Sequence, residues 1–273
     1  MIEVFVIGVG LHGPGLAGWE ASRGVLAGHE PFAGEPPPLP SPAILAPNER
    51  RRASTVVRLA LAVAEEAAGM AGLPPGGMNG VFASANGDGA LVHTILETLA
   101  EPTGQVSPTQ FHNSVHNAPA AYWSIGTGAT RAASSLSCHD ATAAAALLRA
   151  AAEAKVGEEP VLLCLYDAPL PEPLASVRPI RFIFGAALVL APHPDAGALA
   201  RLRLEWCDVP GRLPTPPRLS ALRALHSANP AAGLLPVLEA LAASRASVLA
   251  LPLLDGQVAV DVEPCSDKSS FAG

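Results

Sequence analysis

The chain has 273 residues, of which 49% are hydrophobic and 15% charged, and its formal net charge at pH 7 is −7. This composition indicates a globular chain with a sizeable core and argues against a disordered one. Its one basic run is Arg50-Arg51-Arg52, so the chain lacks the clustered Lys and Arg that nucleic-acid binding requires. No uninterrupted apolar stretch is long enough to span a bilayer, and no membrane span is expected.

Four cysteines are scattered along the chain without any CxxC pair: Cys138, Cys164, Cys207 and Cys265. Two of them lie in apolar, strand-like segments. This usage suits free thiols in a reducing compartment better than a disulfide framework, and it predicts a cytoplasmic protein.

Apolar periodicity and turn residues predict the secondary structure. In chain order up to residue 190, the expected elements are a strand at 4–7, a helix around 17–27, a proline-rich loop at 31–47, a helix at 49–71, a strand at 80–83, helices at 108–115 and 118–126, a strand at 132–136, a helix at 140–155, and strands at 161–166 and 182–190. Beyond residue 195 we expect strands at 202–206, 247–251 and 258–262 and one helix at 234–243.

The first part of this order reads β-α-β-α-β-α-β-β. Near-continuous apolar strands that alternate with helices imply an α/β fold, with a mixed sheet covered by helices on both faces. Because the pattern changes after residue 195, we predict an N-terminal domain at 1–195 and a C-terminal α+β extension at 196–273.

The first strand is followed by glycines at the spacing GxGxxG, from Gly8 to Gly13. In dinucleotide-binding units such glycines let a pyrophosphate approach the backbone. Here no second strand ending in an acidic residue follows about 20 residues later. A tight turn between strand and helix is therefore the preferred interpretation of these glycines, and no cofactor is expected.

His112 and His116 lie four residues apart and could share one helix face, with Cys138 as a third zinc ligand. No second ligand pair has metal spacing. Capping and polar packing are therefore the favoured interpretation of these histidines, and no metal is expected.

The stretch SSLSCHD at 134–140 places Ser137 and Cys138 between a predicted strand and a predicted helix. A thiol at a helix N-terminus becomes more acidic, and a serine needs a base within hydrogen-bond reach. His139 is adjacent in sequence, but neighbouring residues point in different directions. A catalytic elbow and an ordinary cap formed by Ser137 or Asp140 both remain open at this point.

Several segments together resemble the beta-ketoacyl synthases of the thiolase superfamily. The segments that carry the resemblance are VFVIGVGLHGPGLAGWEASRGVLAG, NERRRASTVVRLALAVAEEAAGMAGL, GVFAS, SPTQFHNSVHNAPAAYWSIGTGA, ASSLSCHDATAAAALLRAA, VLLCLYDAPLP and FGAALVLAP. They cover about residues 1–192 and imply one half of a thiolase-type fold. The chain looks most similar to the short chain length factors of aryl polyene-type pathways.

Departures from the family bear on its chemistry. An active ketosynthase has Cys at the elbow, where this chain is expected to place Ser137, with Cys138 one position late and aimed away from the tunnel. The family's two histidines of the second half have no counterpart here, since the contexts of His193 and His226 do not match those motifs. The resemblance therefore implies a vestigial elbow and no condensation by this chain alone.

By the same resemblance, we expect a non-catalytic subunit that forms a heterodimer with an active beta-ketoacyl synthase and shapes its acyl tunnel. The pathway would be aryl polyene, polyketide or fatty-acid-type biosynthesis, with an acyl carrier protein as an indirect partner. The candidate tunnel residues are Phe111, Ser114, Ala118 and Tyr122, and ordinary core packing is the alternative for each of them.

Two further functions stay open. One is a small acyltransferase or thioesterase with Cys138 or Ser137 as nucleophile. The other is a scaffold for acyl carrier proteins, which are usually acidic and would be repelled by a chain of net charge −7 outside the Arg50–Arg52 area.

Overall fold

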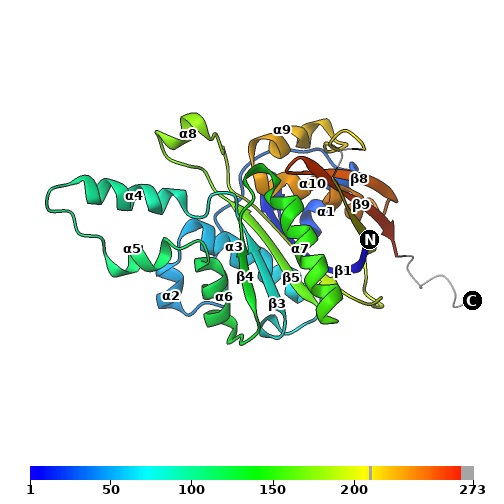
Figure 1. The fold of residues 1–273 in the computed structure, drawn as a ribbon, viewed down its shortest axis with the longest axis horizontal. Helices are drawn as coiled ribbons and strands as arrows, with labels where there is room; N and C mark the ends of the chain where they lie inside the picture. The colour runs from blue at the N-terminus through cyan, green and yellow to red at the C-terminus, as the bar shows by residue number, and fades with distance from the viewer. Residues whose placement is uncertain (209–210, 266–273) are drawn as a thin grey trace, which may run out of the picture.

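A computed structural model describes residues 1–208 and 211–265. Its centre is one nine-stranded sheet in the order β4-β3-β5-β6-β1-β7-β9-β8, with the short β2 paired to β1 (Figure 1). β3 runs parallel to β4 and to β5, and the other neighbouring strands are antiparallel. The strands are β1 Ile2–Gly13, β2 Leu16–Ala17, β3 Asn79–Ala83, β4 Ala133–Leu136, β5 Val161–Asp167, β6 Phe184–Ala191, β7 Ala200–Cys207, β8 Ser247–Leu253 and β9 Gly256–Pro264.

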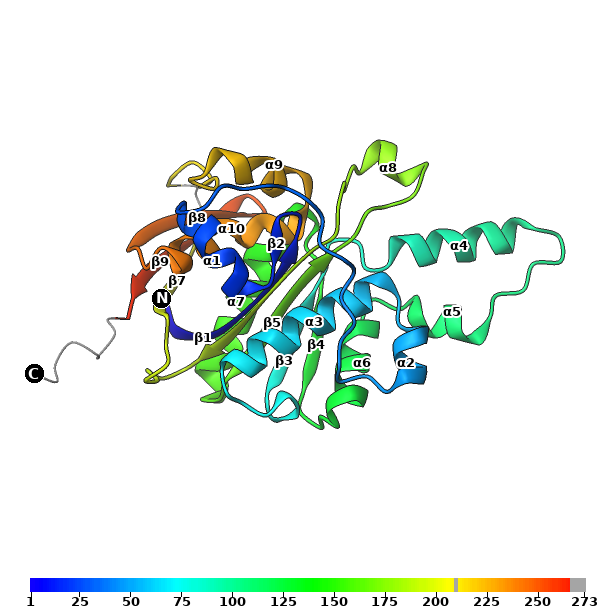
Figure 2. The ribbon, with the colours of Figure 1, turned by 180° about the vertical axis from the view of Figure 1, so that it is seen from behind.

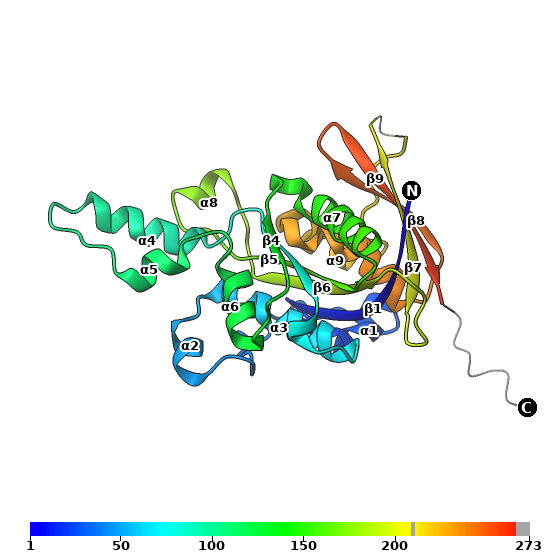
Figure 3. The ribbon, with the colours of Figure 1, turned by 60° about the horizontal axis from the view of Figure 1, so that its bottom comes forward.

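Helices cover both faces of this sheet, and the predicted fold class is confirmed (Figure 3). The α-helices are α1 Trp19–Ala27, α2 Pro47–Arg52, α3 Thr55–Met70, α4 Gly89–Ala100, α5 Pro108–Asn113, α6 Ala118–Thr127, α7 Thr142–Gly157, α8 Leu174–Val177, α9 Ser220–Ala228 and α10 Leu235–Ala242. The short 3-10 turns are η1 Pro75–Gly77, η2 His139–Ala141 and η3 Pro230–Leu234. One core joins α1, α7, η3 and α10 to one face, and a second joins α3 and α6 to the other.

β1 is longer than predicted and continues through the glycines that were expected to form a turn. A Cβ on Gly8 would lie 2.2 Å from the carbonyl oxygen of Ala67, and one on Gly10 would lie 1.9 Å from that of Val63. The turn interpretation is therefore wrong. These glycines let α3 approach the strand backbone closely, which is a recognised use of glycine in strands.

The long helix predicted at 49–71 is in fact two helices. Ala53 is extended, and Ser54 caps α3 by accepting a hydrogen bond from the backbone N–H of Val57. Serine is a preferred N-cap residue, so a new helix starts here. The apolar periodicity that predicted the helix belongs to α3, whose buried side is rich in Val, Leu and Ala.

The strands beyond residue 195 extend the same sheet. β7 pairs antiparallel with β1, with Leu204 opposite Ile2, and β9 and β8 follow. Strands on either side of residue 195 thus share one hydrogen-bonded sheet, and the division into two domains stays a prediction.

Three helices were not predicted, namely α4, α8 and α9. α4 and α5 project from the body, as Figures 1 and 2 show. We call residues 89–113, which contain these two helices, the arm. Within the described residues, no helix is both long enough and apolar enough to cross a membrane.

Candidate functional site at the β4–α7 elbow

The elbow between β4 and α7 contains an extra turn. η2 lies between Cys138 and Thr142, so α7 starts two residues later than predicted. The Thr142 hydroxyl donates to the carbonyl of His139 (2.7 Å) and accepts from the backbone N–H of Cys138 (3.0 Å). His139 takes a left-handed conformation with φ of 51°. Cys138 is therefore outside the first turn of α7.

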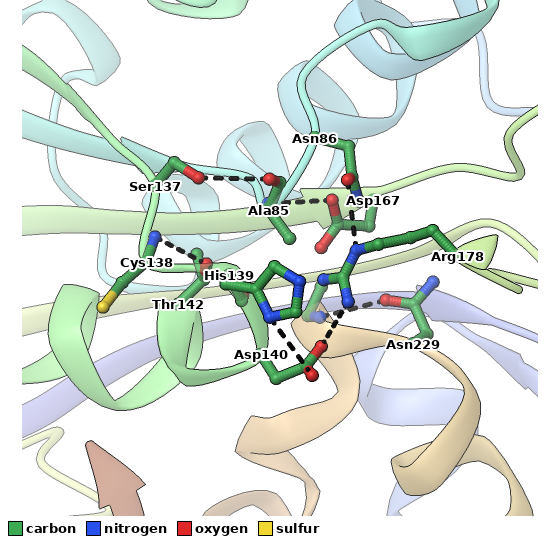
Figure 4. A network of polar contacts seen from close by, with 11 residues as sticks. Ala85, Asn86, Ser137, Cys138, His139, Asp140, Thr142, Asp167, Arg178 and Asn229 are labelled. Carbon is green, nitrogen blue, oxygen red and sulfur yellow. Dashed lines mark hydrogen bonds and ion pairs between the residues drawn. The ribbon is translucent and has the colours of Figure 1, made fainter. Parts of the chain in front are cut away.

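Ser137 and Cys138 point in different directions (Figure 4). The exposed Ser137 hydroxyl donates to the carbonyl of Ala85 at 3.1 Å. Cys138 is half-buried and contributes to the lining of a pocket next to the elbow, whereas Ser137 does not. The expected orientation of Ser137 and Cys138 relative to an acyl tunnel stays a prediction.

The pocket has a volume of ≈ 640 Å³ and lies between the elbow, η3 and the β8–β9 turn. Its apolar walls include Ala144, Ile180 and Leu251, and its polar groups include Arg178 and His226. Burial lowers the pKa of His226, which favours the neutral form of this imidazole. Among the hydrogen bonds of the described residues, none joins a histidine to the Cys138 sulfur, so the usual activated thiol is not assembled.

His139 and Asp140 lie at the surface beside this pocket. The Nδ1 atom of His139 is 3.3 Å from Asp140 Oδ2, and both side chains are more than 70% exposed. Arg178 Nη1 donates to Asp140 Oδ1 at 2.8 Å, and its Nε donates to Asn86 Oδ1 at 3.2 Å. The His139 imidazole is therefore exposed to solvent, where it pairs with the Asp140 carboxylate, and in the described part of the chain it does not contact a nucleophile.

A buried polar cluster that sequence reasoning missed lies behind the elbow. Asp167, at the end of β5, is 1% exposed and accepts hydrogen bonds from the Ser84 hydroxyl (2.8 Å) and the Ala85 N–H (3.0 Å). Burial raises the pKa of Asp167 from 3.8 to about 6, against the opposing effects of these bonds and of Arg178. Its signal in the sequence was a carboxylate directly after a continuous apolar strand.

The four candidate tunnel residues do not lie on one helix face. Phe111 is on α5 and 69% exposed, while Ser114 ends α5 and its hydroxyl donates to the Phe111 carbonyl at 2.8 Å. Ala118 and Tyr122 are on α6, each 2% exposed, in the core under α3. Phe111 alone among them presents a large apolar surface to the outside.

His112 and His116 are not on one helix either, because α5 ends at Asn113. His112 packs edge-on against Tyr122, and the Nε2 atom of His116 lies 3.0 Å from the carbonyl oxygen of Ser84. In residues 1–208 and 211–265, no cluster of three or more His, Cys, Asp or Glu side chains has metal-binding proximity. The zinc hypothesis therefore has no support in the geometry.

The structure thus defines an α/β protein with a mixed sheet between two helical layers and an elbow from strand to helix at the sheet edge. The sequence profile described as "Beta-ketoacyl synthase, N-terminal domain" matches residues 26–250. The chain therefore belongs to this family, as its sequence motifs predicted. No curated protein sequence matches the chain.

Solved structures share the fold. A chain of "Ketosynthase (ApeO) in Complex with its Chain Length Factor (ApeC) from Xenorhabdus doucetiae" aligns with a TM-score of 0.72 and 18% identity, over 96% of this chain and 100% of that one. A chain of "The ishigamide ketosynthase/chain length factor" aligns with a TM-score of 0.68 and 16% identity, over 96% and 99%. A beta-ketoacyl synthase from Burkholderia phymatum STM815 aligns at 0.57 and 16% identity, over 90% of this chain and 71% of that one.

Proposed function

We propose that this chain is a non-catalytic ketosynthase-like subunit, a chain length factor, which pairs with an active beta-ketoacyl synthase and shapes its acyl tunnel. The pathway we propose is aryl polyene, polyketide or fatty-acid-type biosynthesis. The observation that carries the proposal is the surface of α4, because this apolar helix buries none of its residues in the chain itself.

Large hydrophobic side chains are exposed along the arm, on the segment that follows it and on α6: Val92, Leu96, Leu99, Phe111, Val115 and Ile125. Isolated exposed hydrophobic residues are ordinary, but a cluster on projecting helices marks an interaction surface. Burying such a surface against a partner removes it from water, which is the main driving force of tight association.

The neighbouring sheet edge supports the same interpretation. β4 is the last strand of the sheet, and its Ala133 and Ser135 are exposed. An open edge strand presents unpaired N–H and C=O groups to a strand of another chain. The arm and this edge would together form one continuous interface with the ketosynthase.

The choice of a ketosynthase over a second copy rests on two features. Cys138 is not paired with a histidine in the described residues, so a homodimer would contain two unactivated elbows. Two structures with this fold are titled as a ketosynthase with its chain length factor, and the chains matched in them are covered over at least 99% of their length. The free thiols at positions 138, 164, 207 and 265 suit assembly in the cytoplasm.

In this role Phe111 is the best placed of the candidate tunnel residues, because its ring is exposed on the arm. The test is co-expression with a beta-ketoacyl synthase encoded next to it, followed by co-purification and analysis of product length. We expect a stable heterodimer, and we expect Phe111→Ala to lengthen the products by removing a steric stop. Leu213→Ala removes an exposed side chain that is distant in sequence from the arm and is the control. It should change neither the formation of the heterodimer nor the length of the products.

A chain that purifies as a homodimer, or that never associates with a ketosynthase, contradicts the pairing. Unchanged product lengths with Phe111→Ala in an intact heterodimer contradict the tunnel role of this residue alone.

A further inference from the structure

The arm is held to the body at its two ends rather than along its length. α4 contributes no buried residue, and in α5 the buried residue is Asn113. A projecting helix pair without a packed apolar face gains little stability from tertiary contacts. Its direction relative to the body therefore depends on the segments that connect it to β3 and α6 and on the end of α5, where the Asn113 amide donates to the Arg52 carbonyl at 3.0 Å.

Ser84, the residue after β3, joins both of these segments. Its hydroxyl donates to Asp167 and accepts from the N–H groups of Gly87 (2.8 Å) and Asn86 (3.3 Å), which lead into the arm. Its carbonyl oxygen lies 3.0 Å from the His116 Nε2 atom, on the segment that returns from the arm. Ser84 is fully buried, and its hydrogen bonds to Asp167 and Gly87 are therefore protected from competing water, whereas those to Asn86 and His116 are part-buried.

The elbow contributes to the same attachment, as Figure 4 shows. The backbone N–H of Ser84 donates to the carbonyl of Leu136, and the Ser137 hydroxyl donates to the carbonyl of Ala85. In an active enzyme the elbow would position a nucleophile. In this chain the elbow residues instead form hydrogen bonds with the loop that leads into the arm. The buried carboxylate of Asp167 supports this loop from the neighbouring strand.

We propose that Ser84 and Asp167 are positioning residues that set the direction of the arm and thereby place Phe111 against the partner. This inference rests on the proposed function, because the orientation of the arm matters through the partner that it contacts. Without the cluster, the arm would sample several directions and occupy the binding-competent one for only part of the time. The apparent affinity for the partner falls in proportion to that fraction.

The first measurement is hydrogen exchange on the isolated chain. Ser84→Ala removes the hydroxyl that links Asp167 to Asn86 and Gly87, and His116→Ala removes the link to the returning segment alone. We expect both variants to accelerate exchange at 85–117 by about tenfold or more, while amides of β1, β5 and β6 exchange as in the wild type. Ser176→Ala is the matched control, since its exposed hydroxyl bonds a backbone carbonyl outside the arm.

The second measurement uses the heterodimer. If the arm holds its binding orientation a tenth of the time, the partner binds about tenfold more weakly, and the product lengths spread over a wider range. A substitution that lowers only stability would shift the melting temperature and leave the length distribution unchanged. Asp167→Asn keeps the oxygen that accepts from Ser84 and Ala85, and it should exchange more like the wild type than Asp167→Ala does.

Unchanged exchange at 85–117 in both Ser84→Ala and His116→Ala overturns the inference, and this result does not depend on any partner. Faster exchange with unchanged affinity and product length also overturns it. If the wild-type chain binds no ketosynthase, the proposed function fails, and the exchange data still report on the attachment of the arm.

Discussion

Gly10 of β1 and Val63 of α3 are in direct backbone contact, such that a Cβ on Gly10 would lie 1.9 Å from the Val63 carbonyl oxygen. The contact brings the longest apolar helix of the second core onto the central strand of the sheet. It also explains why a glycine pattern resembling a nucleotide-binding turn occurs inside a strand.

Gly10→Ala should therefore destabilise the fold, because the backbone of α3 must move to admit a methyl group. We expect the free energy of unfolding in urea to fall by about 3 kcal/mol or more. Gly69→Ala is the matched control, since its Cβ would meet no atom within 4 Å, and it should stabilise α3 by about 0.5 kcal/mol. Equal midpoints for the two variants would refute the close contact.

Asp167→Asn should change how stability depends on pH. The pKa of Asp167 is about 6 in the folded chain and is raised from 3.8, so the folded state holds the proton more tightly. The stabilisation that the protonated carboxyl contributes is thus fully present below pH 4 and is lost as the pH rises from 4 to 6. At pH 7 the free energy of unfolding is therefore lower by about 3 kcal/mol than at pH 4 on account of this group.

Urea unfolding at pH 4, 5, 6 and 7 measures this dependence. We expect the stability of Asp167→Asn relative to the wild type to increase across the range, with the exposed Asp195→Asn as the control for loss of a surface charge. A difference that is constant from pH 4 to pH 7 would show that Asp167 titrates normally.

Leu96→Asp should abolish association with the ketosynthase and leave the isolated chain folded. Leu96 is 58% exposed on α4, so a carboxylate at this position costs little in the free chain. In the heterodimer the same carboxylate would be buried with no opposite charge to compensate it, which strongly destabilises the interface. Co-purification and the melting temperature of the free chain check the two halves of this prediction. Leu213→Asp, at an 88% exposed position two residues before Thr215, whose N–H donates to Ala250 of β8 at the opposite end of the strand order, should bind as the wild type does.

The isolated chain should form no covalent adduct with an acyl thioester. Cys138 contributes to the pocket, but among the described residues no histidine is hydrogen-bonded to its sulfur, and the Ser137 hydroxyl is engaged with Ala85. Intact-mass spectrometry after incubation with an acyl thioester tests this expectation. An adduct that disappears in Cys138→Ala would instead support the acyltransferase or thioesterase alternative.

The sequence by itself determined the alternation of strands and helices. Strand and helix periodicities depend on neighbouring residues, and segments such as Val161–Asp167 are apolar enough to be unambiguous. The capping box of α5 is local in the same sense, because both of its hydrogen bonds join Ser107 and Gln110, three residues apart. Family motifs then extended this local reading to the class of fold.

Only the tertiary structure decided the roles of individual residues. The contact between Gly10 and Val63, the pocket that Cys138 shares with His226 and Leu251, and the convergence of Ser84, His116 and Asp167 join positions far apart in the chain. α4 was missed although its apolar residues recur at helical spacing, and only the tertiary structure shows that this apolar stripe is not buried within the chain. Such relationships follow from long-range packing, which local sequence patterns do not encode.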